Sequence, residues 1–309
     1  MTHNLSSYAL PLAIVSTALI VGAFEPAFLT LESAISVVHR MAIIGIMAIG
    51  MTFVIMTAGI DLSVGPTLAL SGLVSFFSLQ VVGIPLPFAI LAGLLSGAFV
   101  GAVNGFVVAV FQLPAIIVTL GMLSIVRGSA LILGGPALHQ ISNMPAYSFI
   151  GTGSVLGVPL SVWLFAAVAG VAIWVQRYTA YGVRVSSLGD NPTAAHLSGF
   201  RTRLLTFSTY VICGTCAALA GIIESTQVYT ASANFGEFGT ELDAISAVIL
   251  GGASLFGGKA FVYKTVLGVL FLGIINSGLN ILNVPIAAQL IVKGAIIVAA
   301  LALASWRKV

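Results

Sequence analysis

Charged side chains are scarce in this sequence. Only 6% of its 309 residues are Asp, Glu, Lys or Arg, whereas 59% are hydrophobic. Soluble domains carry about 25% charged residues, because a globule of this size needs charged groups to cover its exterior. The scarcity therefore excludes a water-soluble enzyme. A content of 9% aromatic residues and the lack of a fixed glycine period also exclude a disordered or a fibrous chain.

The few charges are also unevenly spread. Asp61 is the only charged residue between Arg40 and Arg127, and none lies between Arg127 and Arg177. Uncharged stretches of this length indicate a polytopic membrane protein. The net charge of +3 does not come from a basic patch with interleaved aromatic residues. The basic residues lie at the ends of apolar runs instead, so we expect no nucleic-acid partner.

Cysteine is nearly absent. The two cysteines, Cys213 and Cys216, form a Cys-x-x-Cys motif inside an apolar run. A redox site needs accessible thiols, and a zinc site needs two further ligands. We therefore expect the pair to pack as small residues on one helix face, and we predict no metal site.

The apolar runs predict an all-α polytopic membrane protein with a single transmembrane domain over residues 1–309. A span needs about 20 apolar residues. The runs predict about ten transmembrane helices, at residues 9–25, 41–58, 66–82, 87–110, 115–134, 160–178, 204–225, 243–257, 262–281 and 285–304. The eighth of these runs is short, so a re-entrant segment is the alternative to a full span there.

The basic residues predict the orientation in the membrane. Cytoplasmic loops carry an excess of Lys and Arg. With ten spans, most of the basic residues flank loops or ends on one side of the membrane. Both termini and the loop of about 179–203 are therefore expected in the cytoplasm. The residues on that side are Arg177, Arg184, Arg201, Arg203, Lys259, Lys264, Arg307 and Lys308.

A glycine-rich break separates the second and third runs. Gly59 and Gly65 permit unusual backbone angles, and Pro66 fits the first turn of the next helix. Asp61 or Ser63 can accept hydrogen bonds from that helix's free N–H groups. A capped helical hairpin explains these residues, and a hinge or a substrate-facing break is the alternative.

Polar residues within or between the spans are candidates for a translocation path. An amide at membrane depth must find a partner or line a wet cavity. Neutral amides also suit the hydroxyl groups of a polyol, because they carry no large desolvation cost. Hydrogen bonding between helices is the alternative for each amide. The candidates are Asp61, Ser63, Asn104, Asn276, Asn280 and Gln289.

The cytoplasmic loop predicts a very short helix at residues 189–199. Asp190 or Asn191 serves as its N-cap, Pro192 is its first residue and Gly199 ends it. A two-turn helix is not stable alone in water, so we interpret it as a rigid knob that another protein grips. The candidate coupling residues are Gly189, Asp190, Asn191, Pro192, Ala194, Ala195, Ser198 and Gly199.

The sequence offers no energy source and no catalytic site. The nearest match to a Walker loop, residues 251–260, has Ala253 where Gly is needed and Ala260 where Ser or Thr is needed. We therefore expect a transport subunit without enzymatic activity and without a cofactor of its own. Carboxylates at membrane depth are few, which weakens the alternative of an ion-coupled secondary transporter.

Three segments together resemble the permease subunits of bacterial ABC sugar importers, the ribose-type family. They are residues 48–52 leading into 59–65, the 189–199 loop, and residues 241–245 with 248–252. Their order and spacing match over nearly the whole chain. Two features depart from the family pattern: Asp190 stands where Gly is more usual, and the 111–114 loop lacks the basic residue often found there.

The resemblance implies a partnership. Two such permeases, identical or different, form the path in the bacterial inner membrane. Two cytoplasmic ATP-binding subunits hold ATP and Mg, and a periplasmic sugar-binding protein delivers the substrate. The resemblance assigns the 189–199 helix to a groove of the ATPase, and it matches Glu241 and Asp243 to motif positions without giving them a role.

The expected function is thus that of a membrane-spanning permease subunit of an ATP-driven importer for a monosaccharide or a related polyol. An ion-coupled secondary transporter is one alternative. An ABC permease for another small solute, such as a branched-chain amino acid, is the other.

Overall fold

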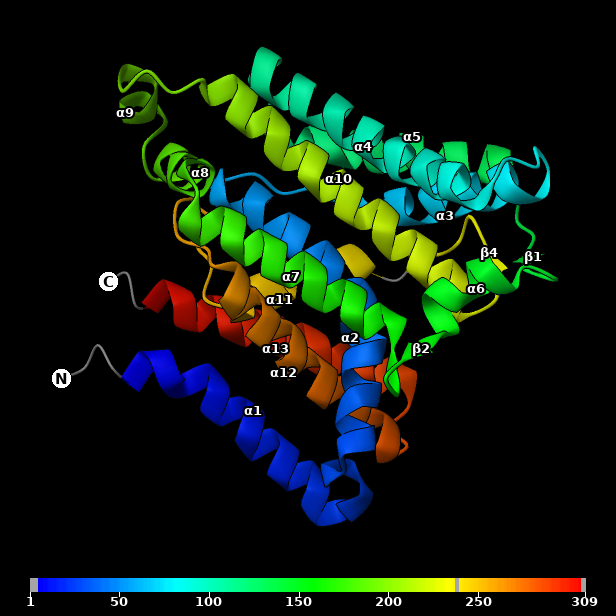
Figure 1. Ribbon diagram of the computed structural model, residues 1–309. Helices are drawn as coiled ribbons and strands as arrows, with labels where there is room; N and C mark the ends of the chain where they lie inside the picture. The colour runs from blue at the N-terminus through cyan, green and yellow to red at the C-terminus, as the bar shows by residue number, and fades with distance from the viewer. Residues whose placement is uncertain (1–4, 237–238, 307–309) are drawn as a thin grey trace.

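The computed structural model describes residues 5–236 and 239–306, which form helices joined by short loops (Figure 1). Two antiparallel ladders of two residues per strand are the exceptions in this part of the chain: β1 (His139–Gln140) pairs with β4 (Thr230–Ala231), and β2 (Ser154–Val155) pairs with β3 (Val158–Pro159). The helices are α1 (Leu5–Phe24), η1 (Pro26–Leu29), α2 (Leu31–Met56), α3 (Val64–Gln80), α4 (Leu86–Phe111), α5 (Ala115–Gly134), α6 (Pro145–Thr152), α7 (Leu160–Tyr178), α8 (Ala180–Asp190), α9 (Pro192–Leu197), α10 (Thr202–Gln227), α11 (Thr240–Leu250), α12 (Val262–Ile281) and α13 (Ile286–Trp306).

The predicted all-α polytopic membrane fold is confirmed. Among the described residues, six helices are long and apolar enough to cross a membrane, namely α2, α4, α5, α7, α10 and α12. Within the part of the chain whose burial the structure describes, α1, α3 and α13 contribute shorter apolar helices, Ala9–Phe24, Val64–Gln80 and Ile286–Ile296. Each of the ten predicted spans overlaps one helix, with α1, α3, α11 and α13 accounting for the others. The number ten itself stays a prediction.

Helix α11 is too short for a full span. Its 11 residues cover about 16 Å along the helix axis, whereas the hydrocarbon core is about 30 Å thick. The eighth span was predicted to extend to residue 257, but residues 251–261 form turns instead. The eighth apolar run is therefore a half-helix, as the re-entrant alternative predicts.

The two ends of the molecule carry different elements. The start of α1 and the end of α13 lie on the same side as α8 and α9, whereas β1, β4, α6 and β2 lie on the opposite side (Figure 1). This arrangement is what the predicted orientation requires. Assigning the α9 side to the cytoplasm stays a prediction, and Arg307 and Lys308 lie outside the described residues.

Helix α10 is the centre of the packing, in contact with α2, α3 and α4. Glycines at every fourth residue of α4 allow the closest approach: a Cβ on Gly101 would overlap the Tyr210 carbonyl oxygen, and one on Gly105 would lie 2.7 Å from the Phe207 carbonyl oxygen. Small residues let two helix backbones pack this closely. Close packing matters in a membrane because lipid tails are as apolar as the side chains, so no hydrophobic effect drives the helices together.

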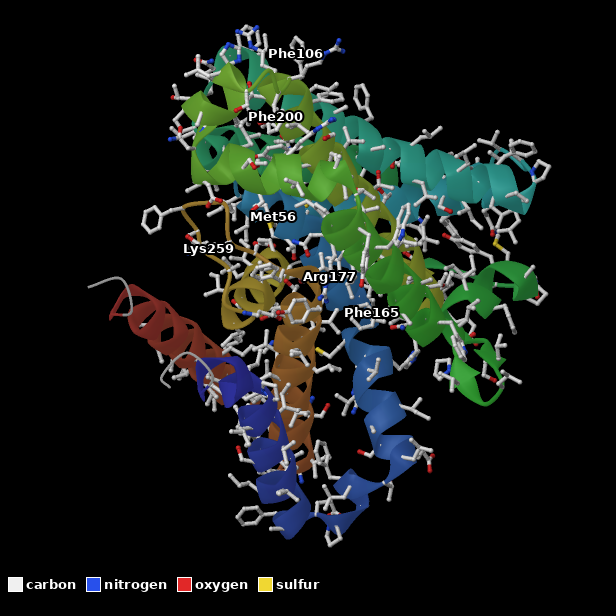
Figure 2. All side chains as sticks on the ribbon, turned by 60° about the vertical axis from the view of Figure 1, so that its left-hand side comes forward. Met56, Phe106, Phe165, Arg177, Phe200 and Lys259 are labelled. Atoms are coloured by element: carbon white, nitrogen blue, oxygen red, sulfur yellow. The ribbon has the colours of Figure 1, made fainter. Side chains whose placement is uncertain are left out.

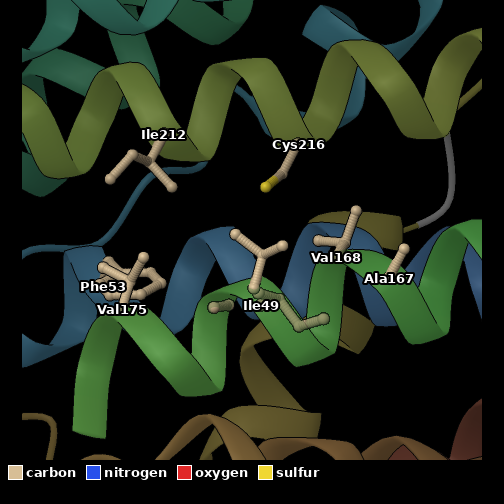
Figure 3. Close-up of a pocket in the computed structure, with 9 residues that line it drawn as sticks. Ile49, Phe53, Ala167, Val168, Val175, Ile212 and Cys216 are labelled. Carbon is tan, nitrogen blue, oxygen red and sulfur yellow. The ribbon is translucent and has the colours of Figure 1, made fainter. Parts of the chain in front are cut away.

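The two cysteines are free and pack as predicted. A Cβ on Gly50 of α2 would lie 2.8 Å from the Cα of Cys213 and 2.9 Å from the Cβ of Cys216. Cys216 also faces an apolar cavity of about 370 Å³ between α2, α7 and α10 (Figure 3). The cavity is lined by Ile49, Phe53, Ala167, Val168, Val171, Ala172, Val175, Ile212 and Cys216.

Candidate functional site

Helix α9 is a capped, six-residue helix at one end of the molecule. The side-chain oxygen of Asn191 accepts a hydrogen bond from the Ala194 N–H at 2.9 Å, and Pro192 is the first helical residue. Gly199 has a φ of +81°, in the left-handed region that ends helices. The short helix is confirmed, with Asn191 rather than Asp190 as its N-cap.

Among the side chains of α9 itself, only that of Ala195 is buried against the rest of the protein. Ala195 is 3% exposed and packs in a cluster that includes Leu188 and Leu205. The other α9 side chains are exposed, and Leu197 is exposed to 82%. Ala194 and Ser198 are therefore exposed, whereas Ala195 anchors the helix internally, and the coupling role of all three stays a prediction.

Gly189 and Asp190 precede this helix and form the end of α8. Gly189 is buried, and a Cβ there would overlap the Met56 carbonyl oxygen. The same oxygen accepts a hydrogen bond from the Gly258 N–H at 2.9 Å. Gly189 therefore serves internal packing and not the accessible surface, which corrects the prediction that placed it in the short helix.

The surface around α9 is basic and hollowed. Arg184, Arg201 and Arg203 are exposed, and the Arg184 guanidinium lies 5.8 Å from the ring centre of Phe200. A cavity of about 650 Å³ opens between α9 and the ends of α2, α4 and α10. An acidic partner surface would match these charges. The cavity is lined by Thr57, Val108, Ala109, Gln112, Leu113, Leu188, Pro192, Thr193, His196, Thr202, Arg203 and Thr206.

Three of the candidate path residues form one buried hydrogen-bonded cluster. Asp61 Oδ1 accepts from the Ser63 N–H at 2.9 Å and from the Ser63 hydroxyl at 2.6 Å. The Asn104 amide lies 3.3 Å and 3.4 Å from the two Asp61 oxygens and donates to Ser63 Oγ at 2.9 Å. All three residues are at most 1% exposed. The cluster fixes the break before α3 and is closed to solvent in this structure.

The backbone of the break is held from several sides. Ala58 has a φ of +60°, and the Thr119 hydroxyl of α5 donates to the Ile60 carbonyl oxygen at 3.1 Å. Beside the break, the Tyr210 hydroxyl and Asn104 Oδ1 are buried without a hydrogen-bond partner among the described residues.

The three amides late in the chain lie apart from this cluster. The Gln289 amide of α13 donates to Asn280 Oδ1 and to the Val284 carbonyl oxygen, both at 2.9 Å. Asn280 is exposed, and the buried Oδ1 of Asn276 has no partner among the described residues. The structure therefore joins Asn280 to Gln289, as interhelical hydrogen bonding predicts, and leaves Asn276 as the amide with unused capacity.

Glu241 lies where the start of α11 meets the start of α3. A Cβ on Gly65 of α3 would lie 2.7 Å from both Glu241 Oε2 and the Gly236 carbonyl oxygen. Arg127 of α5 donates to the carbonyl oxygens of Phe235, at 2.8 Å, and Gly236, at 3.2 Å. The start of α3 and the start of the half-helix α11 thus meet, and Arg127 binds the turn that leads into α11.

Asp243 links the half-helix to the last helix. Its Oδ2 lies 3.0 Å from Lys293 Nζ of α13, and the two side chains are 20% and 21% exposed. The sequence shows Arg127 and Lys293 as embedded charges, but not their partners. Both partners lie more than 45 residues away in the chain, so no local signal identifies them.

Comparisons with known proteins agree with this arrangement. A family model described as "Branched-chain amino acid transport system / permease component" matches residues 33–301. The ribose import permease protein RbsC of Escherichia coli K12 is 40% identical over 286 residues, which cover 91% of this chain and 88% of that protein. No solved structure matches.

Two further relatives from Escherichia coli K12 are similar over most of their length. The galactofuranose transporter permease protein YtfT is 36% identical, covering 89% of this chain and 80% of that protein. The D-allose transport system permease protein AlsC is 35% identical, covering 92% and 87%.

The matched region contains α9, the buried cluster and the α11–α13 link. Together with the apolar helices, it identifies a multi-pass protein of the bacterial inner membrane. The resemblance to ribose-type permeases that the motifs predict is confirmed. The chain belongs to the family of branched-chain amino acid transport system permease components.

Proposed function

We propose that this chain is the membrane-spanning permease subunit of an ATP-driven importer for a monosaccharide or a related polyol. The observation that carries the proposal is α9, an exposed, capped helix on a chain without a nucleotide-binding motif. Such a helix provides a rigid contact for a separate energy-supplying subunit. Relatives named for ribose, galactofuranose and allose support a sugar as the substrate class.

The proposed assembly has three kinds of partner. Two cytoplasmic ATP-binding subunits, which hold ATP and Mg, dock on α9 and its basic surroundings. A periplasmic sugar-binding protein delivers substrate to the opposite side, where β1–β4 and β2–β3 lie. A second permease, a copy of this chain or a paralogue, completes the path. Residues 1–309 act in it as one transmembrane domain, and this chain itself contributes no catalysis.

A branched-chain amino acid is the second candidate substrate, because the matching family model is named for that transport system. A zwitterion requires charged groups along its path. Glu241 and Asp243 lie in the first turn of the half-helix, Arg127 binds the turn before it, and Asp243 and Lys293 are paired with each other. The amide with unused hydrogen-bonding capacity, Asn276, is neutral, which favours hydroxyl groups.

Uptake into vesicles tests the proposal. The permease is purified with the ATPase and the secreted binding protein encoded by neighbouring genes, and it is reconstituted with ATP inside the vesicles. We expect ATP-dependent uptake of at least one of ribose, allose or galactofuranose, and none with a non-hydrolysable ATP analogue. Uptake driven by a proton or sodium gradient without ATP would contradict the energy source. Uptake of leucine but of no sugar would contradict the substrate class.

A further inference from the structure

Gln176, in the last turn of α7, uses its whole carboxamide to join three chain segments. Its Nε2 donates to the Ala260 carbonyl oxygen at 2.8 Å and lies 3.1 Å from the Met56 sulfur, at the end of α2. Its Oε1 accepts from the Val262 N–H at 2.8 Å, at the start of α12. The side chain is half-buried. Gln176 is not part of α9, of the buried cluster or of the α11–α13 link.

Helix α8 completes the same contact. A Cβ on Gly182 would overlap the Gln176 carbonyl oxygen, so α8 begins directly against the last turn of α7. The Ser186 hydroxyl donates to the Gly258 carbonyl oxygen at 2.9 Å, and the Gly258 N–H donates to the Met56 carbonyl oxygen at 2.9 Å. We call the set Met56, Gln176, Ser186, Gly258, Ala260 and Val262 the four-segment junction.

Figure 2 shows this region from the α9 end of the molecule, with Met56 beside the turn that carries Lys259 and Arg177 nearby. The junction consists of hydrogen bonds from the Gln176 and Ser186 side chains to backbone groups, together with the backbone bond between Gly258 and Met56. Gly257 and Gly258 have φ values of +91° and +72° and no side chains that could interlock with their neighbours. Hydrogen bonds are directional, so they fix the segments relative to one another where apolar packing alone leaves them free to slide.

The junction is connected to α9 on one side. The Asn191 N–H donates to the Ser187 carbonyl oxygen at 3.1 Å, so the N-cap of α9 is still bonded to the last turn of α8. A displacement of α9 therefore reaches α8 without an intervening flexible loop.

The junction is connected to the buried cluster on the other side. Met56 is the last residue of α2, and the break that contains Asp61 and Ser63 follows it directly. A Cβ on Gly257 would lie 3.1 Å from the Ala58 Cβ. The turn after α11 and the break before α3 are thus in direct contact.

We propose that Gln176 is a positioning residue that locks the end of α7, against which α8 begins, to the end of α2 and to the start of α12, so that a displacement of α9 by the docked ATPase moves the Asp61–Ser63–Asn104 break. This rests on the proposed function, because it presupposes an ATPase on α9. Without the Gln176 bonds, the ATPase still docks and hydrolyses ATP, but less of its motion reaches the break.

The test compares Gln176→Met with Gln227→Met in the complete complex in vesicles. Methionine keeps the length of the side chain and removes the amide. Gln227, the last residue of α10, is also half-buried but lies outside the junction. We expect Gln176→Met to lower transport per ATP hydrolysed by about fivefold or more, the low end for coupling between distant sites, with the ATPase still co-purifying. Gln227→Met should keep the wild-type ratio.

A second measurement does not depend on transport. Hydrogen exchange of residues 57–63 should change when the ATPase binds to the wild-type permease, and this change should be lost in Gln176→Met. Ser186→Ala, which removes one bond of the junction, should act in the same direction and more weakly. An unchanged ratio and an unchanged exchange response would overturn the proposal. Loss of ATPase binding in Gln176→Met would also overturn it, by showing a role in docking or folding.

These outcomes separate the two proposals. If wild-type vesicles take up no sugar in an ATP-dependent way, the proposed function fails whatever the variant does. If wild-type uptake is normal and Gln176→Met behaves like Gln227→Met, only the role of Gln176 fails.

Discussion

Gly189 in α8 packs so closely against the Met56 carbonyl oxygen at the end of α2 that a Cβ on Gly189 would overlap this oxygen. The oxygen is also hydrogen-bonded to the Gly258 N–H. The segment that carries α9 therefore rests on the same residue from which the buried break before α3 begins. The exposed helix α9 and the buried Asp61–Ser63–Asn104 cluster are thus connected through the packed backbone at Met56.

Gly189→Ala should destabilise the protein. Alanine is favoured over glycine in a helix by about 1 kcal/mol, but the overlap with backbone atoms of Met56 and Gly258 outweighs this gain, as overpacking typically costs about 1–3 kcal/mol. We expect a lower melting temperature in detergent. Gly170→Ala in α7 is the matched control, because nothing lies within 4 Å of a Cβ there. Equal melting temperatures for the two variants would contradict the contact.

Ala194→Glu and Ala195→Glu should fail for different reasons. Ala194 is exposed, so a bulky acidic side chain there should abolish co-purification of the ATPase while the melting temperature of the permease stays unchanged. Ala195 is 3% exposed, so a buried, unpaired carboxylate should lower the melting temperature as well. A normal yield of ATPase with Ala194→Glu would refute docking on α9. An unchanged melting temperature for Ala195→Glu would refute its role as the anchor.

Asn104→Asp should be strongly destabilising. The substitution replaces the amide that donates to Asp61 and Ser63 by a second carboxylate at the same place. Two like charges about 4 Å apart repel by on the order of 4 kcal/mol at an effective dielectric constant of 20. Asn283→Asp, in an exposed turn, is the control and should be nearly neutral. Thermal unfolding at neutral pH checks both, and similar losses would show that the cluster is not closed.

Asp243 and Lys293 should behave as a pair. Asp243→Asn or Lys293→Met alone leaves one charge without its partner, whereas the double variant removes both. We expect the single variants to lose more stability than the double variant, with a coupling energy of about 1 kcal/mol or more in a double-mutant cycle. Since both side chains are about one-fifth exposed, solvent screening limits the value. Additive losses would show that α11 and α13 are not linked by this contact.

Local chemistry made much of the fold predictable. Apolar runs located the helices α1–α5, α7 and α10–α13, although not α6 and α8. Asn191, Pro192 and Gly199 predicted the short helix with its correct end. These features depend on neighbouring residues in the chain. The motifs also identified the family, because their residues and their order can be read directly from the sequence.

Partners distant in the chain were not predictable. Nothing near Gln176 indicates that it binds Ala260 and Val262, and nothing near Lys293 indicates Asp243. Gly189 and Ala195 were predicted as coupling residues of the short helix, and the sequence did not show that tertiary packing buries both. The polar residues of the spans could be recognised as candidates, but the sequence could not show that Asp61 and Asn104 bond to each other.

The most direct measurement of the central claim is photo-crosslinking in intact membranes. A photoreactive amino acid replaces Ala194 on α9 in one variant and Leu156 in another. Leu156 is 89% exposed and follows β2, which lies on the side opposite α9. We predict that the Ala194 variant crosslinks to the ATP-binding subunit and the Leu156 variant does not. Crosslinking of the ATPase at Leu156, or its absence at Ala194 in a complex that hydrolyses ATP and imports sugar, would contradict the account.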